Sequence, residues 1–353
     1  MPKSNFFLPF RKPSQTEWLE LLGDNAHRQF RISDSIHVPV FIHEENAIVA
    51  PPLAGKKENQ WNITGYIPTS NASKANQLAL DMLRGGVDEI VFVLRKPNIE
   101  ALLHDIQLPL IETSFAWHNE STPKAMAWMK QLHAYCQQKN WDSQTLKGSF
   151  QLRPFTQSGR LRPGLQAYLQ NGDRLFPNFK LLAIHQDDTL EIELAFAKIL
   201  RQVQKLFSAS KDKALIINKL QIHLIAGTNI ITTIANIRAF KRLWLHWLQK
   251  QNLPLALPDI AVTLDTTHWT NDVNQNRILA TSQAMSAAIA GIQHLIIPTI
   301  EPDTFSERIS RNIQHIMKME AHLDRVVDPA AGSKIIEALT ERIAIAAFEQ
   351  LSV

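Results

Sequence analysis

The feature that most constrains this chain is a regular alternation of short apolar runs with helix-length amphipathic segments, which begins near residue 71. The apolar runs are rich in β-branched and aromatic residues, which is typical of buried strands. Eight such runs span residues 89–94, 109–113, 148–153, 179–185, 220–226, 260–264, 292–297 and 324–327. Helical patterns span residues 72–84, 123–138, 188–207, 230–251, 275–290, 304–320 and 333–350. Strands that alternate with helices form parallel βαβ units, and eight units predict a closed (β/α)8 TIM barrel over residues 71–353.

An open, doubly wound sheet is the alternative fold for the same alternation. That fold places a glycine-rich GxGxxG turn after a strand when it holds a dinucleotide. No such motif follows any of the predicted strands. The sequence therefore favours the barrel.

The first 70 residues lack this alternation. They hold seven prolines, one short helical pattern near residues 14–22, and several aromatic residues, namely Phe6, Phe7, Phe10, Trp18 and Trp61. This composition is too apolar for a disordered tail. We therefore expect residues 1–70 to form an N-terminal arm that contributes no barrel strand and packs on the barrel or on a partner.

Composition excludes several classes of protein. The net charge is only +4, and no run of five or six like charges occurs, which argues against a nucleic-acid partner. The single cysteine, Cys136, cannot form an intrachain disulfide, and no Cys/His cluster has metal-ligand spacing. Neither a signal peptide nor an apolar stretch of membrane-spanning length is present. We expect a cytoplasmic protein that binds no membrane and no metal.

Four segments carry motifs of one enzyme family. The most specific, FSERISRNIQHIMKMEAHLDRVVDPAAGSKIIEALTERI at residues 305–343, fits the pattern ARIARNTQ…EES…RVVDPxGGSYxxExLT. Residues 228–247 fit NFxxxIAKxRAxRxLW, residues 272–295 fit DPYVNxLRTTxEAxAAxxGGxxxL, and residues 61–94 give a weaker match. These segments resemble the methylmalonyl-CoA mutase family, and the resemblance implies the same barrel and cobalamin-linked acyl-CoA chemistry.

The first departure of this sequence from the family pattern concerns cobalamin binding. Catalytic members carry a flavodoxin-like cobalamin-binding domain with an Asp-x-His-x-x-Gly motif, whose histidine ligates cobalt. The sequence ends at Val353, one helix after the last predicted strand, and its nearest echo of the motif, Asp265-Thr-Thr-His268, lacks the glycine. The resemblance thus implies that this chain has no cobalamin-binding flavodoxin-like domain. It would meet adenosylcobalamin only through a partner chain or a separate domain.

The resemblance also identifies three candidate site residues. His185 ends the fourth predicted strand, where the family has SGYHxxEAG and a histidine that donates a hydrogen bond to the substrate thioester. A histidine satisfied by a neighbouring loop is the alternative. Lys219 and Gln221 stand at the fifth predicted strand, where the family's RLS triplet contacts substrate. Lysine keeps the positive charge but cannot form the bidentate hydrogen bonds of arginine. The alternative is a lysine at a strand edge that binds no ligand.

Other motif positions have lost the family's residues. The family segment RPWTIRQYAGF, which reaches over the substrate, is reduced here to Trp61, Ile63 and Tyr66. Leu279 stands at the arginine position of NxLRxT, and the DPxGGS turn reads DPAAGS at residues 328–333. The scaffold pattern is kept while the site chemistry is lost.

This combination resembles the small, non-catalytic beta subunit of heterodimeric methylmalonyl-CoA mutases. It implies a chain that is inactive on its own and that pairs with a catalytic mutase subunit. A second hypothesis is the substrate-binding barrel of a split acyl-CoA isomerase, which a separate cobalamin domain would complete. A third is a stand-alone acyl-CoA-binding scaffold.

Overall fold

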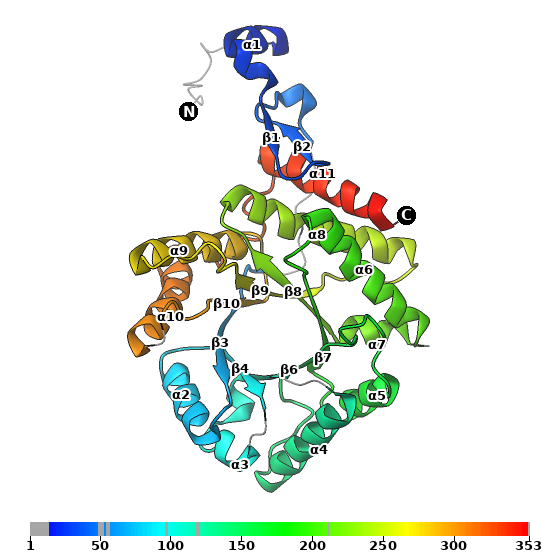
Figure 1. Ribbon diagram of the computed structural model, residues 1–353, viewed down its shortest axis with the longest axis vertical. Coiled ribbons are helices and arrows are strands. Elements are labelled where there is room, and N and C mark those ends of the chain that lie inside the picture. The colour runs from blue at the N-terminus through cyan, green and yellow to red at the C-terminus, as the bar shows by residue number, and fades with distance from the viewer. Residues whose placement is uncertain are drawn as a thin grey trace, which may run out of the picture.

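The core of the molecule is a ring of parallel strands surrounded by helices (Figure 1). The computed structural model describes residues 14–48, 53, 57–95, 98–117, 121–210, 212–301 and 303–351. Eight parallel strands follow the order β5-β4-β3-β10-β9-β8-β7-β6. They are β3 (Asn62–Pro68), β4 (Glu89–Leu94), β5 (Glu112–Trp117), β6 (Gly148–Leu152), β7 (Phe179–His185), β8 (Leu220–Ala226), β9 (Asp259–Leu264) and β10 (His294–Ile296).

The two outer strands of this order meet and close the sheet. Residues Glu112 and Lys147 form a parallel bridge, and the Thr113 amide donates to the Lys147 carbonyl at 3.1 Å. Gly148 has a backbone φ of +152°, and a Cβ atom on this residue would lie 1.9 Å from the Thr113 carbonyl oxygen. Only glycine fits so close an approach of two backbones. The predicted TIM barrel is confirmed, and this glycine forms part of its seam.

The helices lie outside the ring and cover the strands (Figure 1). They are α2 (Ala72–Arg84), α3 (Ile99–Leu102), α4 (Thr122–Gln138), α5 (Leu165–Leu175), α6 (Ile192–Ser208), α7 (Lys213–Asn218), α8 (Ile230–Lys250), α9 (Val273–Ile289), α10 (Thr304–Met319) and α11 (Lys334–Leu351), with the 3-10 turn η3 (Leu108–Leu110). Each helix with a predicted counterpart lies within a few residues of it. The sequence did not predict α3, α5 and α7, which are short.

The first barrel strand is the main departure from the predicted strand order. Strand β3 lies inside residues 1–70, so the prediction that this range holds no barrel strand was wrong. Its sequence, NITGYIP, holds two polar residues, a glycine and a proline, and so lacks a continuous apolar run. Pairing with β4 on one side and β10 on the other supplies the backbone hydrogen bonds that keep it extended.

Two other predicted strands need correction. Residues 324–327 form turns and bends between α10 and α11. Val326 is exposed, and the apolar run of two valines is too short for a buried strand. The strand predicted at 109–113 starts at Glu112, since Pro109 lies in the 3-10 turn η3. Proline cannot donate to a strand ladder. Because β3 adds one strand before those that the sequence predicted, His185 ends the fifth barrel strand, and Lys219 directly precedes the sixth.

A smaller unit precedes the barrel and rests on its last helix. It comprises α1 (Gln15–Leu22), η1 (Gly23–His27), η2 (Glu44–Asn46) and an antiparallel pair of strands, β1 (Gln29–Arg31) and β2 (His37–Pro39). Strand β2 packs on α11 (Figure 1), and Val38 and Ile36 are buried. The Ser33 hydroxyl donates to the Glu193 carboxylate at 2.9 Å. The described part of the arm is therefore attached to the barrel.

Helix α1 is the exception within the arm. It buries none of its residues, and Leu21 is 83% exposed. Figure 1 shows it at the far end of the arm from the barrel. The predicted aromatic anchors Phe6, Phe7 and Phe10 lie outside the described residues.

A buried ion network joins α8 to the turn before α11. The Arg238 guanidinium binds the Asp328 carboxylate and, at 2.6 Å, the Glu337 carboxylate, and Arg242 binds the other Glu337 oxygen at 2.6 Å. Arg238 and Glu337 are both fully buried. The Asp328 carboxylate also accepts from the Leu53 amide at 2.9 Å. This network holds the DPAAGS turn, whose retained glycine has a φ of +81°.

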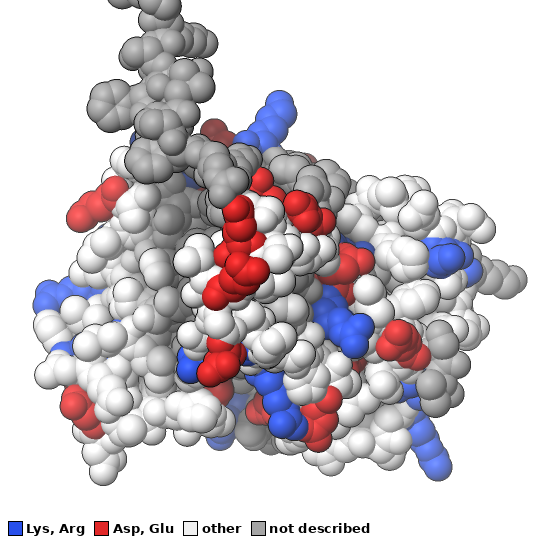
Figure 2. All heavy atoms as spheres, turned by 90° about the horizontal axis from the view of Figure 1, so that it is seen from above, with Lys and Arg blue, Asp and Glu red and all other residues white. Residues whose placement is uncertain are grey.

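The outer surface carries both signs of charge. Figure 2 shows acidic and basic side chains interspersed on the face seen from above. Among the described residues, every helix is too short or too polar to cross a membrane.

Candidate functional site

A cavity of about 520 Å³ lies inside the barrel toward the carboxyl ends of its strands. Barrel chemistry is usually found at this end, because the loops that follow the strands meet there. Six of its polar lining residues come from five strands and the segment directly after one of them: Tyr66, Trp117, Gln151, Arg153, His185 and His223. Glu307, Arg311 and Gln314 of α10 also line it. Several of these residues also line a wider hollow at the rim. The volume suits a small organic ligand.

Two histidines stack against each other in this cavity. The rings of His185 and His223 have centroids 4.2 Å apart and an angle of 26° between their planes. Burial, together with the positive charge of His294, lowers the pKa of His223 to about 4. Burial, followed by the neighbouring His223 and Arg153, also holds the pKa of His185 well below its usual value. Both rings are therefore neutral at pH 7, so His185 can donate a hydrogen bond to a carbonyl group without carrying a charge.

Three further polar groups of the cavity are hydrogen-bond donors. Burial raises the pKa of the Tyr66 phenol, so its hydroxyl keeps its proton. The Trp117 indole Nε1–H is buried and has no hydrogen-bond partner among the described residues. Arg153 adds a guanidinium at the rim. A cavity with this lining can bind a carbonyl or carboxylate oxygen.

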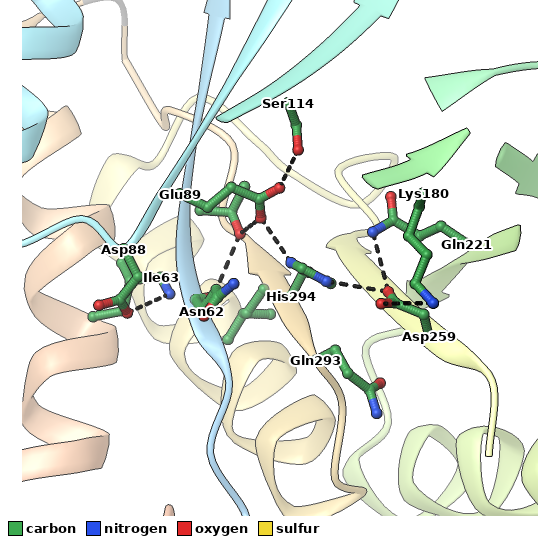
Figure 3. A network of polar contacts seen from close by, with 12 residues as sticks. Asn62, Ile63, Asp88, Glu89, Ser114, Lys180, Gln221, Asp259, Gln293 and His294 are labelled. Carbon is green, nitrogen blue, oxygen red and sulfur yellow. Dashed lines mark hydrogen bonds and ion pairs between the residues drawn. The ribbon is translucent and has the colours of Figure 1, made fainter. Parts of the chain in front are cut away.

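A network of buried charged residues closes the opposite end of the barrel (Figure 3). Its centre is His294, the first residue of β10. The Nδ1 atom of His294 lies 2.7 Å from a Glu89 oxygen, and its Nε2 atom lies 3.1 Å from an Asp259 oxygen. A carboxylate can only accept hydrogen bonds, so both ring nitrogens donate and His294 is a cation.

The neighbours of this cation balance its charge. Glu89 also accepts from the Thr64 hydroxyl at 2.9 Å and the Ser114 hydroxyl at 2.6 Å. Although burial opposes it, the His294 charge and these hydrogen bonds lower the pKa of Glu89. Burial would lower the pKa of His294, but Glu89 and Asp259 outweigh it and raise that pKa well above its usual value. Such a network at the amino-terminal end of a barrel usually stabilises the fold.

The same cluster has the residue types of a metal site. Glu89, Glu112 and His294 bring three potential ligand atoms within 4.8 Å of one another. A metal ion would have to displace the proton that His294 shares with Glu89. The hydrogen bonds on both ring nitrogens favour a proton at this position.

The three predicted site residues do not come together. His185 lines the cavity at the end of β7. Lys219 lies at the other end of the barrel, where its ammonium group binds the Asp173 carboxylate at 2.8 Å and the Pro177 carbonyl. Gln221 is buried near the base and donates to the Asp259 carboxylate at 3.1 Å. The roles of these residues toward a ligand stay predictions, and the contacts of Lys219 favour a structural role.

Sequence reasoning missed most of the polar residues in the barrel. Gln151, Arg153 and His223 line the cavity, yet their segments carry no motif that distinguishes them from ordinary strand residues. In the structure Glu89, Asp259 and His294 are each the first residue of a strand, but of these three only Glu89 begins a strand that the sequence predicted. A charged residue at the start of several buried strands indicates a polar layer at the base.

Comparison with known proteins gives consistent relatives. A model of the methylmalonyl-CoA mutase family matches residues 186–352. The chain is 30% identical to the methylmalonyl-CoA mutase small subunit of Porphyromonas gingivalis over 318 residues, which cover 82% of this chain and 51% of that protein. It is also 30% identical to the methylmalonyl-CoA mutase small subunit of Streptomyces virginiae, over 53% of this chain and 28% of that protein. The matches span about half the length of these relatives or less.

Solved structures give only distant matches. A dihydropteroate synthase from Stenotrophomonas maltophilia covers 74% of this chain and 94% of its own, with 13% identity and a TM-score of 0.42. Similarity this weak says nothing about function, and the fold rests on the strand order itself.

Proposed function

Because the chain belongs to the methylmalonyl-CoA mutase family, we propose that it is the non-catalytic partner subunit of a cobalamin-dependent acyl-CoA mutase. The observation that carries this proposal is the similarity to two proteins named small subunits, which covers 82% of this chain in one case. The sequence supports it, since the family's substrate-covering segment is reduced to Trp61, Ile63 and Tyr66. The contacts of Lys219 support it as well, because its ammonium group is already bound by Asp173 and Pro177.

Among the described residues, the segment most similar to the family's cobalamin motif does not fit a cobalt ligand. The nearest echo of the motif places His268 on the loop after β9, where its side chain is 65% exposed and 4.0 Å from Asp265. The Asp265 carboxylate is itself engaged by the backbone and hydroxyl of Thr267. We therefore propose that the chain meets adenosylcobalamin only through its partner.

Co-purification with a catalytic mutase chain from the same source tests the subunit proposal. The two chains are co-expressed, with an affinity tag on one of them, and the complex is sized by chromatography and light scattering. We expect a stable complex of the two, with mutase activity that the isolated chain lacks. Recovery of this chain alone, with a catalytic chain that is fully active without it, would reject the proposal.

The cavity favours a second candidate, the substrate-binding barrel of a split acyl-CoA isomerase. Neutral His185, the Tyr66 phenol and Gln151 line one pocket at the carboxyl ends of the strands, where a carbonyl group could be bound. Titration of short acyl-CoAs into the isolated chain, followed by the fluorescence of Trp117 and by calorimetry, tests this reading. Saturable binding that His185→Ala abolishes would favour the second candidate over a subunit with an inactive cavity.

A third candidate, the stand-alone acyl-CoA-binding scaffold, predicts acyl-CoA binding without either partner. It is distinguished by the same two experiments. Binding in the titration, together with no complex in co-purification and no activity after addition of a cobalamin domain, would favour it.

A further inference from the structure

A chain of hydrogen bonds runs from the base network to the cavity. His294 Nε2 lies 3.1 Å from Asp259 Oδ1, and Gln221 Nε2 donates to the same oxygen at 3.1 Å. Gln221 Oε1 lies 2.9 Å from Nε2 of His223. Figure 3 shows Asp259 between His294 and Gln221. His223 in turn stacks on His185 and lines the cavity.

The direction of each hydrogen bond in this chain follows from the groups that form it. The Asp259 carboxylate has no proton to donate, so Gln221 must turn its amide nitrogen toward it. The amide oxygen of Gln221 then faces His223. An amide oxygen only accepts, so His223 must carry its proton on Nε2 and leave Nδ1 bare.

We propose that Asp259 and Gln221 are positioning residues that hold His223 of the cavity as the neutral Nε2–H tautomer. The bond between a histidine nitrogen and its partner generally sets which tautomer the ring adopts. The cavity then offers a ring with one bare, accepting nitrogen beside His185. An anionic group of a ligand would find its positive charge at Arg153 or Arg311, because His223 carries none.

The charges around His223 support the neutral form. Burial and the His294 cation disfavour a second positive charge, and Arg153 adds to this effect. The carboxylates of Asp259 and Glu89 act in the opposite direction but do not outweigh burial. The other charged groups near the base are Glu112, and Lys180, which lies 3.9 Å from Asp259. Together these groups hold the pKa of His223 at about 4.

Nuclear magnetic resonance of the full-length chain with ¹⁵N-labelled histidine tests the proposal. Long-range ¹⁵N–¹H correlation spectra separate protonated from bare ring nitrogens. At pH 7 we expect His294 with both nitrogens protonated and His223 with only Nε2 protonated. Histidine-to-glutamine variants at each position assign the signals.

Two variants separate the roles of Asp259 and Gln221. In Asp259→Asn, the side-chain oxygen can still accept from both His294 and Gln221, so His223 should keep the Nε2–H tautomer. In Gln221→Leu, His223 becomes a mixture of tautomers while His294 keeps both protons. Asp173→Asn is the matched control, since Asp173 binds Lys219 outside the network, and it should leave His223 unchanged.

Three results would overturn the proposal. They are a His223 with Nδ1 protonated in the wild-type chain, a charged His223 at pH 7, or an unchanged tautomer in Gln221→Leu. If Asp259→Asn fails to fold, Gln221→Leu decides alone, because it removes no buried charge. The test reads proton positions and does not depend on the proposed subunit function.

Discussion

Arg238 lies in a segment that matches the family pattern, and only the structure supplied its contacts. It lies in the RAxRxLW-like segment of α8, and its two carboxylate partners lie in the segment that holds the DPAAGS turn. These two motif segments, about 90 residues apart in the chain, therefore meet in one buried network. Their joint presence in the sequence reflects this contact.

Replacement of Arg238 by methionine should strongly destabilise the protein. The substitution keeps most of the side-chain volume but leaves Asp328 and Glu337 buried without this partner, which typically costs about 3–5 kcal/mol of unfolding free energy. Urea unfolding measures the loss. Arg84→Met is the control, because the Arg84–Asp81 pair is exposed and such pairs contribute about 0–1 kcal/mol. Equal effects of the two variants would contradict a structural role for the network.

At the scale of elements, the seam between β5 and β6 depends on one residue without a side chain. A methyl group at position 148 would collide with the backbone of Thr113, and backbone cannot move aside as a flexible side chain can. Any other residue at position 148 would therefore force β5 and β6 apart.

Gly148→Ala should open the seam and lower the melting temperature by several degrees or prevent folding. Hydrogen exchange at the Thr113 amide, which bonds across the seam, should rise. Gly227→Ala is the matched control, since a Cβ there meets only Thr233 at an ordinary 3.6 Å. A variant at position 148 as stable as this control would show that the seam is more adaptable than its geometry indicates.

The arm gives a second prediction at this scale. Deletion of residues 1–25 should leave the barrel folded, because α1 buries none of its residues and the barrel begins at β3. Trp18 of α1 contacts Phe41 and His43 of the arm, whereas Leu19 and Leu21 are exposed and offer an apolar surface to a partner. We expect the truncated chain to bind a co-expressed catalytic subunit more weakly.

Co-purification of the full-length and truncated chains measures this effect, with circular dichroism to check folding. Equal recovery of the partner would reject a role for residues 1–25 in assembly. Aggregation of the truncated chain would show that these residues belong to the protein's own core.

At the scale of the whole molecule, the buried histidines predict how stability depends on pH. His185 and His223 have lowered pKa values, so between about pH 4 and the ordinary histidine pKa near 6.5 the unfolded chain binds more protons. Stability therefore rises with pH over this range. The raised pKa values of Glu112 and Glu307 act in the opposite direction, whereas the lowered pKa values of Glu89, Asp187 and Asp259 add to the effect of the histidines at the acid end.

Above about pH 6.5 the direction reverses because of His294. Its raised pKa means that the folded chain keeps a proton that the unfolded chain has lost, so stability falls as pH rises. We expect the free energy of unfolding to peak near neutral pH. Urea unfolding from pH 5 to 9 measures the profile, and His294→Gln should flatten its alkaline limb. An unchanged alkaline limb in this variant would argue against a charged His294.

The sequence by itself determined the barrel, the family and the longer helices. These follow from local signals, because hydrophobic periodicity and motif spacing are properties of neighbouring residues. His185 was singled out by the resemblance to the family's SGYHxxEAG segment, and its role stays a prediction. Reasoning from local signals failed for β3, whose extended form depends on pairing with β4 and β10 on both sides.

Tertiary structure alone decided which polar residues share a site. His294 meets Glu89 across 205 residues of sequence, because β10 and β4 both pair with β3. His185 and Lys219 stand at opposite ends of two neighbouring parallel strands, so they do not meet. Such contacts depend on the register of strands around a ring, and each strand's own sequence does not encode the position of the others.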